Sequence, residues 1–142
     1  MRLLRPDPGE VADRSTILEL KIEAARKTQN DSKPFEAEQD SLADYFHNGK
    51  FAPTIEVKGA YLNLKKELLA VNRKLWVYED EVRSLPGPER WTLDEAMRLA
   101  TLCKSIADLN DLRGDLVGQM NSLFGIHGKE KIYQKKGQAH VQ

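Results

Sequence analysis

One side of a predicted helix carries the side chains that are best suited to hold a polar ligand. Intervals of four, three and four residues separate Asn72, Trp76, Glu79 and Arg83, and Asp80 adjoins them. This spacing places them on one face of a helix. A tryptophan can form a pocket wall while carboxylates and an arginine fix a polar ligand. The same pattern also fits ordinary structure, with a Glu79–Arg83 salt bridge and Trp76 in the core.

Two polar residues, Asn110 and Arg113, interrupt an apolar stripe on a later helix. The rest of that stripe consists of Leu99, Cys103, Ile106, Val117, Met120 and Phe124. Polar groups buried there must be hydrogen-bonded, because each unpaired one costs about 1 kcal/mol or more. They either set register and partner choice, as seam asparagines do in coiled coils, or line a ligand site with the carboxylates described above. Arg113 needs an acid in either case, and Asp13 is the predicted partner.

The sequence predicts no metal site and no cofactor. Two-metal helical bundles use Glu-x-x-His pairs, and the only histidine with that spacing from an acid is His47, which follows Asp44. One cysteine and scattered histidines do not form a zinc site. A magnesium-dependent nucleotide hydrolase would hold its ion through acids on two helices, and the spacing of Glu19 and Glu23 leaves that alternative open.

Charge and hydropathy exclude several classes of function. Basic and acidic residues number 22 each, so the chain lacks the basic excess that binds phosphates, and nucleic acid is not an expected partner. No apolar run approaches the roughly 18 residues of a membrane span, and the first ten residues do not form a secretory signal. The single cysteine, Cys103, is expected to be a small core residue in a reducing compartment. We therefore expect a cytoplasmic protein.

Capping and turn residues divide the chain into four helices. Asp7 with Glu10, and Thr92 with Glu95, form capping boxes, and the Pro-Gly-Pro sequence at 86–88 must end the third helix. The predicted helices span residues 8–29, 34–47, 55–85 and 92–124. Residues 128–142 are rich in lysine and are expected to be a flexible tail. The pattern predicts a single all-α domain covering residues 1–142.

The third and fourth helices carry the longest apolar seams. Residues of the third follow the 4-3 spacing of a coiled coil: Leu64, Leu68, Val71, Leu75, Tyr78, Val82 and Leu85. We expect a long antiparallel helical hairpin packed with a shorter N-terminal helix and one further short helix, as a three- to four-helix bundle. Gly114 inside the fourth helix indicates close packing against another backbone. Because the N-terminal helix covers only part of the hairpin, a homodimer or higher oligomer is expected to bury the rest.

Three segments resemble a family of small uncharacterised helical proteins of bacteria and phages. They are Asn72-x-x-Leu75-Trp76-x-x-Glu79-Asp80-x-x-Arg83, Ile106-x-x-Leu109-Asn110-x-x-Arg113-x-x-Leu116, and a start similar to Gly9-Glu10-Val11-x-Asp13-x-x-Thr16-Ile17-Leu18-Glu19-x-Lys21. The resemblance covers the first, third and fourth helices and leaves residues 30–51 outside. Genes of this family lie near those for glycosyltransferases and surface-polysaccharide assembly. The resemblance therefore implies a role in cell-surface carbohydrate metabolism without naming an activity.

Two functions follow as expectations. The first is a non-enzymatic helical accessory or interaction protein that self-associates, or binds another protein, in bacterial cell-surface carbohydrate metabolism. The alternative is a small helical enzyme, magnesium-dependent, that acts on a phosphorylated or nucleotide-linked sugar. No catalytic residue is assigned. The candidates for ligand or partner binding are Asn72, Trp76, Glu79, Asp80, Arg83, Asn110 and Arg113.

Overall fold

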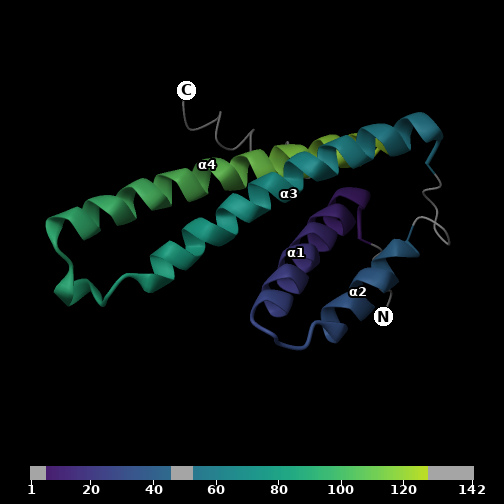
Figure 1. The fold of residues 1–142 in the computed structure, drawn as a ribbon. Coiled ribbons are helices and arrows are strands. Elements are labelled where there is room, and N and C mark those ends of the chain that lie inside the picture. Colours follow the sequence, from purple (N-terminus) through teal and green to yellow (C-terminus); the bar gives the residue numbers. More distant parts are fainter. Residues whose placement is uncertain (1–5, 46–52, 128–142) are drawn as a thin grey trace, which may run out of the picture.

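The computed structural model describes residues 6–45 and 53–127, and these residues form helices and no strand (Figure 1). The predicted all-α fold is confirmed. The elements are α1 (Pro8–Lys27), α2 (Lys33–Ala43), α3 (Ile55–Ser84), the single 3-10 turn η1 (Pro88–Arg90) and α4 (Leu93–Leu123). The predicted flexible tail lies outside the described residues, as do positions 46 and 47 at the end of the second predicted helix.

The helix ends follow the capping residues, with one clear exception. Both predicted capping boxes are present, at the start of α1 and at the start of α4. In contrast, α2 ends at Ala43, well before the predicted end at His47. The Tyr45 hydroxyl donates a hydrogen bond to the Pro6 carbonyl at 2.5 Å. This contact ties the chain after α2 to the segment before α1.

The two long helices, α3 and α4, pack against each other as an antiparallel hairpin (Figure 1). Helix α1 lies across one side of this hairpin and contacts both of its helices, whereas α2 packs on the outer side of α1. The order of layers is therefore α2, α1 and then the hairpin. This arrangement matches the predicted hairpin with a shorter N-terminal helix and one further short helix.

The core lies in the half of the hairpin that α1 covers, which we call the base (residues 55–75 and 111–123). The buried cluster joins one residue of α1 to both long helices: Ala12, Tyr61, Leu68, Val71, Leu75, Leu116 and Met120. The tyrosine ring meets the Phe124 ring edge-on at 6.1 Å between centroids. Three helices meet here, so side chains are enclosed from more than one direction.

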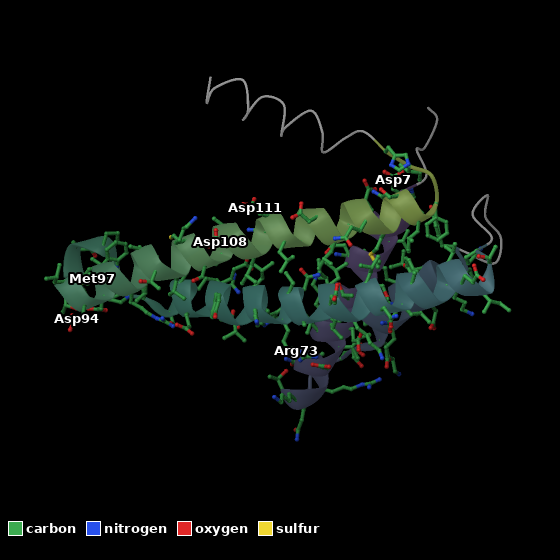
Figure 2. All side chains as sticks on the ribbon, turned by 90° about the horizontal axis from the view of Figure 1, so that it is seen from above. Asp7, Arg73, Asp94, Met97, Asp108 and Asp111 are labelled. Carbon is green, nitrogen blue, oxygen red and sulfur yellow. The ribbon has the colours of Figure 1, made fainter. Side chains whose placement is uncertain are left out.

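Beyond α1 the hairpin continues as two helices and their loop, which we call the arm (residues 76–110). Within the arm, all of which is described, only Leu102 is buried. Leu93, the first residue of α4, is 76% exposed, and Met97, which is 60% exposed, lies near the tip of the arm (Figure 2). Two helices can cover each other on one side only, which explains the low burial.

The structure corrects the predicted stripe on α4. The side of α4 that faces α3 follows a 3-4 spacing through Leu99, Leu102, Ile106, Leu109, Arg113, Leu116, Met120 and Leu123. Cys103 and Asn110 lie outside this seam and are exposed, so the predictions of a core cysteine and a buried asparagine are wrong. The reason is that a 31-residue helix offers two adjacent apolar stripes, and only packing decides which is buried.

Gly114 also differs from the prediction. A Cβ atom added at this position would meet no atom of the described chain within 4 Å, so no second backbone lies against it there. The close approach occurs at Gly9 instead. Separately, no helix among the described residues combines the length and apolar character that crossing a membrane requires.

Candidate functional site

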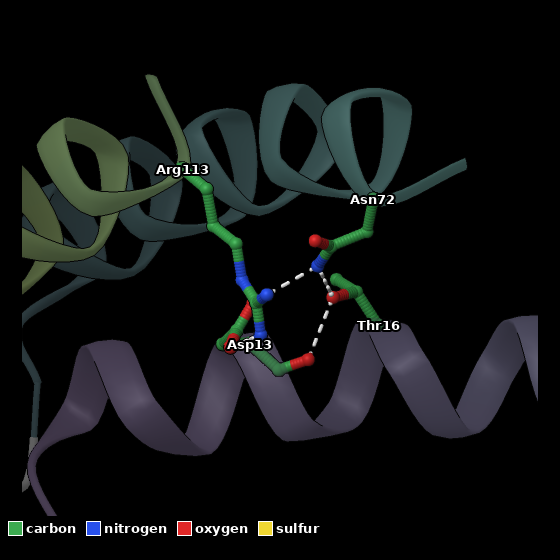
Figure 3. A network of polar contacts seen from close by, with 4 residues as sticks. All are labelled: Asp13, Thr16, Asn72 and Arg113. Carbon is green, nitrogen blue, oxygen red and sulfur yellow. Dashed lines mark hydrogen bonds and ion pairs between the residues drawn. The ribbon is translucent and has the colours of Figure 1, made fainter. Parts of the chain in front are cut away.

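Four polar side chains meet where α1 crosses the hairpin: Asp13 and Thr16 of α1, Asn72 of α3 and Arg113 of α4 (Figure 3). We call these four residues the crossing network. Two of them were singled out from the sequence as candidate binding residues, and a third, Asp13, was the predicted acid for Arg113. Three helices each contribute at least one member, so the network exists only in the folded chain.

The predicted Asp13–Arg113 pair is confirmed. The arginine donates to the two carboxylate oxygens from Nε at 2.9 Å and from Nη2 at 2.5 Å, in the fork geometry that gives strong charge-assisted bonds. The hydrogen bond with Asp13 is the main cause of a raised pKa for the Arg113 guanidinium, and the nearby charge of Glu79 adds to it. The pair is partly shielded, with 18% of the acid side chain and 33% of the arginine side chain exposed.

Asn72 links the ion pair to the buried side of α1. Its amide nitrogen donates to the Asp13 carboxylate at 2.9 Å and to the Thr16 hydroxyl at 2.8 Å. That hydroxyl in turn donates to the Asp13 backbone carbonyl at 2.8 Å. Thr16 and Asn72 are 0% and 4% exposed, so each would be costly to leave unpaired, and the network satisfies both.

The chemistry available to this network is limited by its own hydrogen bonds. The Asp13 carboxylate accepts three bonds, two from Arg113 and one from Asn72, which leaves few lone pairs for a proton or a metal ion. An acid held in this way fixes the angle at which α1 crosses the hairpin. The network therefore positions α1 on the hairpin and does not provide a group for acid–base chemistry.

A second contact holds the N-terminal end of α1 against α4. The Gly9 amide, one of the four free donors at the start of a helix, donates to the Asn121 side-chain oxygen at 2.7 Å. A Cβ atom at Gly9 would lie 2.5 Å from the Val117 carbonyl oxygen, which is backbone and cannot move aside easily. Glycine is therefore required for this approach. Neither Gly9 nor Asn121 was recognised as a contact from the sequence, because cross-helix contacts leave no periodic signal.

The outer part of α1 is tied down by exposed ion pairs. Arg73 of α3 binds the Glu23 carboxylate with both terminal nitrogens, at 2.7 and 3.1 Å. Arg14 of α1 donates to both carboxylate oxygens of Glu38 in α2, from Nε at 2.7 Å and from Nη2 at 2.9 Å. Such surface pairs each contribute at most about 1 kcal/mol. They orient the α1–α2 layer but do not carry its stability.

The other predicted binding residues of α3 do not join the crossing network. Trp76 lies one turn beyond Asn72 and is half-buried, whereas Glu79, Asp80 and Arg83 are exposed. The expected Glu79–Arg83 salt bridge is replaced by a pair between Asp80 and Arg83, 2.5 Å apart and three residues apart in sequence. A spacing of three or of four brings side chains together on a helix, so the sequence alone could not choose between the two acids.

An open groove lies between α1 and the first half of α3. Its volume is about 590 Å³, and it is lined by Thr16, Glu19, Gly59, Leu62, Asn63, Lys65, Lys66 and Leu69. None of the seven predicted binding residues lines it. In the described part of the chain no three histidine, cysteine or acidic residues gather in a way that could hold a metal ion.

Comparison with known proteins adds no assignment. No family model, curated protein sequence or solved structure matches this chain.

Proposed function

We propose that this chain is a non-enzymatic helical interaction protein that self-associates through the arm of its hairpin. In this proposal the crossing network is a structural tether, and the binding surface is the side of the arm that continues beyond α1. The setting is the one that the family resemblance implies, cell-surface carbohydrate metabolism, with the protein acting in the cytoplasm.

The observation that carries the proposal is the contrast between the two ends of one helical face. Asn72, Trp76, Glu79 and Arg83 follow one another along the same side of α3. The first is 4% exposed where α1 crosses α3, whereas Trp76 is half-buried and Glu79 and Arg83 are exposed. A half-buried tryptophan beside exposed acid and arginine has the composition of a binding hot spot, in which tryptophan and arginine are enriched.

The apolar residues in the rest of the arm favour self-association over a monomer. Most of the arm's seam residues remain half-exposed, including Tyr78, Val82, Leu99 and Ile106. A third or fourth helix would remove them from water, which is worth roughly 25 cal/mol per Å² of apolar surface. Equal numbers of acidic and basic residues also mean that two copies do not repel each other through net charge.

The test is the mass of the protein in solution as its concentration rises. Light scattering on the full chain, from about 1 to 100 micromolar, is expected to move from the 16.2 kDa of one chain toward twice that mass. A reducing agent is required, because exposed Cys103 would otherwise form disulfides between copies. A mass of one chain at every concentration contradicts self-association.

Adjacent residues of α3 offer a matched pair of variants. Trp76→Gln is expected to shift the protein toward the monomer, whereas Val77→Gln is expected to leave the mass unchanged. Val77 is 50% exposed and lies on a different side of α3. Cys103→Arg adds a third variant that alters an exposed position on α4 and removes no core contact. It is also expected to weaken association, with helix content followed by circular dichroism to show that the fold is intact.

A further inference from the structure

We propose that two copies of this chain pair through their arms in antiparallel orientation about a two-fold axis, on the same side of the hairpin that α1 occupies at the base. This inference rests on the proposed function and specifies its geometry. The axis lies midway between Glu79 and Arg83 of α3. Each arm then supplies the third and fourth helices that the other arm lacks, which closes the assembly at two copies.

The charges on α3 are self-complementary in this arrangement. Glu79 and Arg83 lie one turn apart on the same face. A two-fold axis between them places Glu79 of one copy opposite Arg83 of the other, and the reverse pair forms by symmetry. Glu79 is exposed, and its charge acts on Arg113 of the same chain without an ion pair between them, while Asp80 holds the Arg83 guanidinium at the surface. The acid is therefore available, and the arginine is oriented.

The adjacent side of α4 permits a close approach. Small side chains recur there at intervals of four, three and four residues, at Ala96, Ala100, Cys103 and Ala107, and all are exposed or half-buried. Seven residues, about two helical turns, separate Ala107 from Gly114 and Gly114 from Asn121, so all three lie on nearly the same side of α4. Asn121 accepts the hydrogen bond from the Gly9 amide of α1. The strip is thus on the α1 side of α4. Its small residues let a second helix lie near the α4 backbone, as Gly9 allows at the base.

The area of the proposed contact between the two arms indicates how tightly the dimer should bind. The paired region runs along α3 from Trp76 to the loop at Pro86, about 15 Å, and is two helices, about 20 Å, wide. That gives a flat area of about 300 Å² per copy, or about 600 Å² in total, below the roughly 1,200–2,000 Å² of stable specific complexes. A reversible dimer is expected rather than an obligate one.

The tryptophan has a defined place in this dimer. Trp76 lies five positions from the axis, about 7.5 Å along the helix, so it is level with the Pro86-Gly87-Pro88 loop of the second copy. That loop is held in shape by the Trp91 indole nitrogen, which donates to the Pro86 carbonyl at 2.6 Å. A flat ring against a rigid proline loop loses little entropy on association.

Charge reversal with mixing tests the geometry. Glu79→Arg leaves two arginines facing two arginines across the axis, and Arg83→Glu leaves acids facing acids. Each variant alone is expected to raise the dissociation constant by at least about tenfold. Mixed in equal amounts, the two variants place opposite charges together again and should form a heterodimer with close to the wild-type dissociation constant. Sedimentation at several concentrations, with one variant fluorescently labelled, measures all three.

Mixing separates this effect from one inside a single helix. A pair lost within one chain stays lost after mixing, whereas a pair between copies is restored. The matched control is the Lys104–Asp108 pair of α4, which has the same four-residue spacing and is 78% and 61% exposed. Lys104→Glu and Asp108→Lys, alone or mixed, should leave the dissociation constant unchanged.

The outcomes separate this inference from the proposed function. If the wild-type chain dimerises but mixing restores nothing, the axis is wrong while self-association stands. If each single variant dimerises as tightly as the wild-type chain, the arm pairing is wrong. If the wild-type chain is monomeric throughout, both proposals fail.

Discussion

The base and the arm are two halves of one hairpin, and they differ in how many of their side chains are buried. In the base, α1 crosses α3 and α4, and the crossing network satisfies the polar groups that this contact encloses. In the arm the same two helices continue with similar seam spacing, yet only Leu102 is buried. The comparison shows that seam spacing predicts which residues face a neighbouring helix, whereas burial depends on how many helices are present.

The same contrast sorts the polar residues that the sequence singled out. Asn72 and Arg113 lie where α1 crosses the hairpin, and both already form hydrogen bonds with side chains of α1. Trp76, Glu79 and Arg83 lie beyond α1 and keep part of their binding capacity. Local stability should differ in parallel, since few buried contacts and exposed backbone hydrogen bonds favour local opening.

The largest expected effect compares two fully or nearly buried leucines, one in each half. Leu68→Ala removes a side chain with 0% exposure from the three-helix core and should lower the free energy of unfolding by about 3 kcal/mol. Leu102→Ala in the arm should cost less at low protein concentration, because the two-helix surroundings can collapse around the gap. Chemical denaturation measures both. Equal losses at 1 micromolar would remove the distinction between base and arm.

A double-mutant cycle tests the ion pair that links the base to α1. Asp13→Ala and Arg113→Met each leave a partly buried charge without its main partner, and each should destabilise the fold by about 1–3 kcal/mol. The double variant should be less destabilised than the sum, with a coupling energy of about 1–2 kcal/mol. The exposed Arg73–Glu23 pair is the control, and its coupling should be below about 1 kcal/mol. A coupling near zero for Asp13–Arg113 would mean that the fork does not form in solution.

Replacing glycine by alanine should destabilise the fold at Gly9 and stabilise it at Gly114. Gly9→Ala forces a Cβ atom to within 2.5 Å of the Val117 carbonyl oxygen and should cost about 1–3 kcal/mol by pushing α1 off α4. Gly114→Ala adds a Cβ atom where no described atom lies within 4 Å, and should stabilise the monomer by about 0.5–1 kcal/mol through helix propensity. Thermal unfolding at low concentration measures both. Destabilisation by Gly114→Ala that appears only at high concentration would place the second copy over this residue.

The smallest expected effect concerns the enzymatic alternative. Asp80 is paired with Arg83 at the surface of the arm, so the interaction proposal expects no change in melting temperature with millimolar Mg²⁺ or Mn²⁺, with or without nucleotide sugars. Asp80→Asn should behave as the wild-type chain does in this assay. A clear rise in melting temperature that Asp80→Asn abolishes would favour a metal-dependent site, because a ligand stabilises only the state that binds it.

Much of the architecture was determined by local sequence. Capping boxes fixed the starts of α1 and α4, the proline-rich loop separated α3 from α4, and the 4-3 spacing identified the side of α3 that faces α4. These features act within a few residues of each other, so a single sequence carries them. Even the Asp13–Arg113 pair could be predicted, because a buried guanidinium requires an acid and few were available.

Only the tertiary structure decided which of two adjacent stripes on α4 is buried, and hence that Cys103 and Asn110 are exposed. It also decided that Asp80 rather than Glu79 binds Arg83, and that Gly9 rather than Gly114 lies against another backbone. For the stripe and for the ion pair, helical periodicity allowed both answers, because they differ by one residue position along the same helix. The Gly9 contact was decided by where α1 crosses the hairpin, and that position depends on contacts between residues up to 112 apart in the chain.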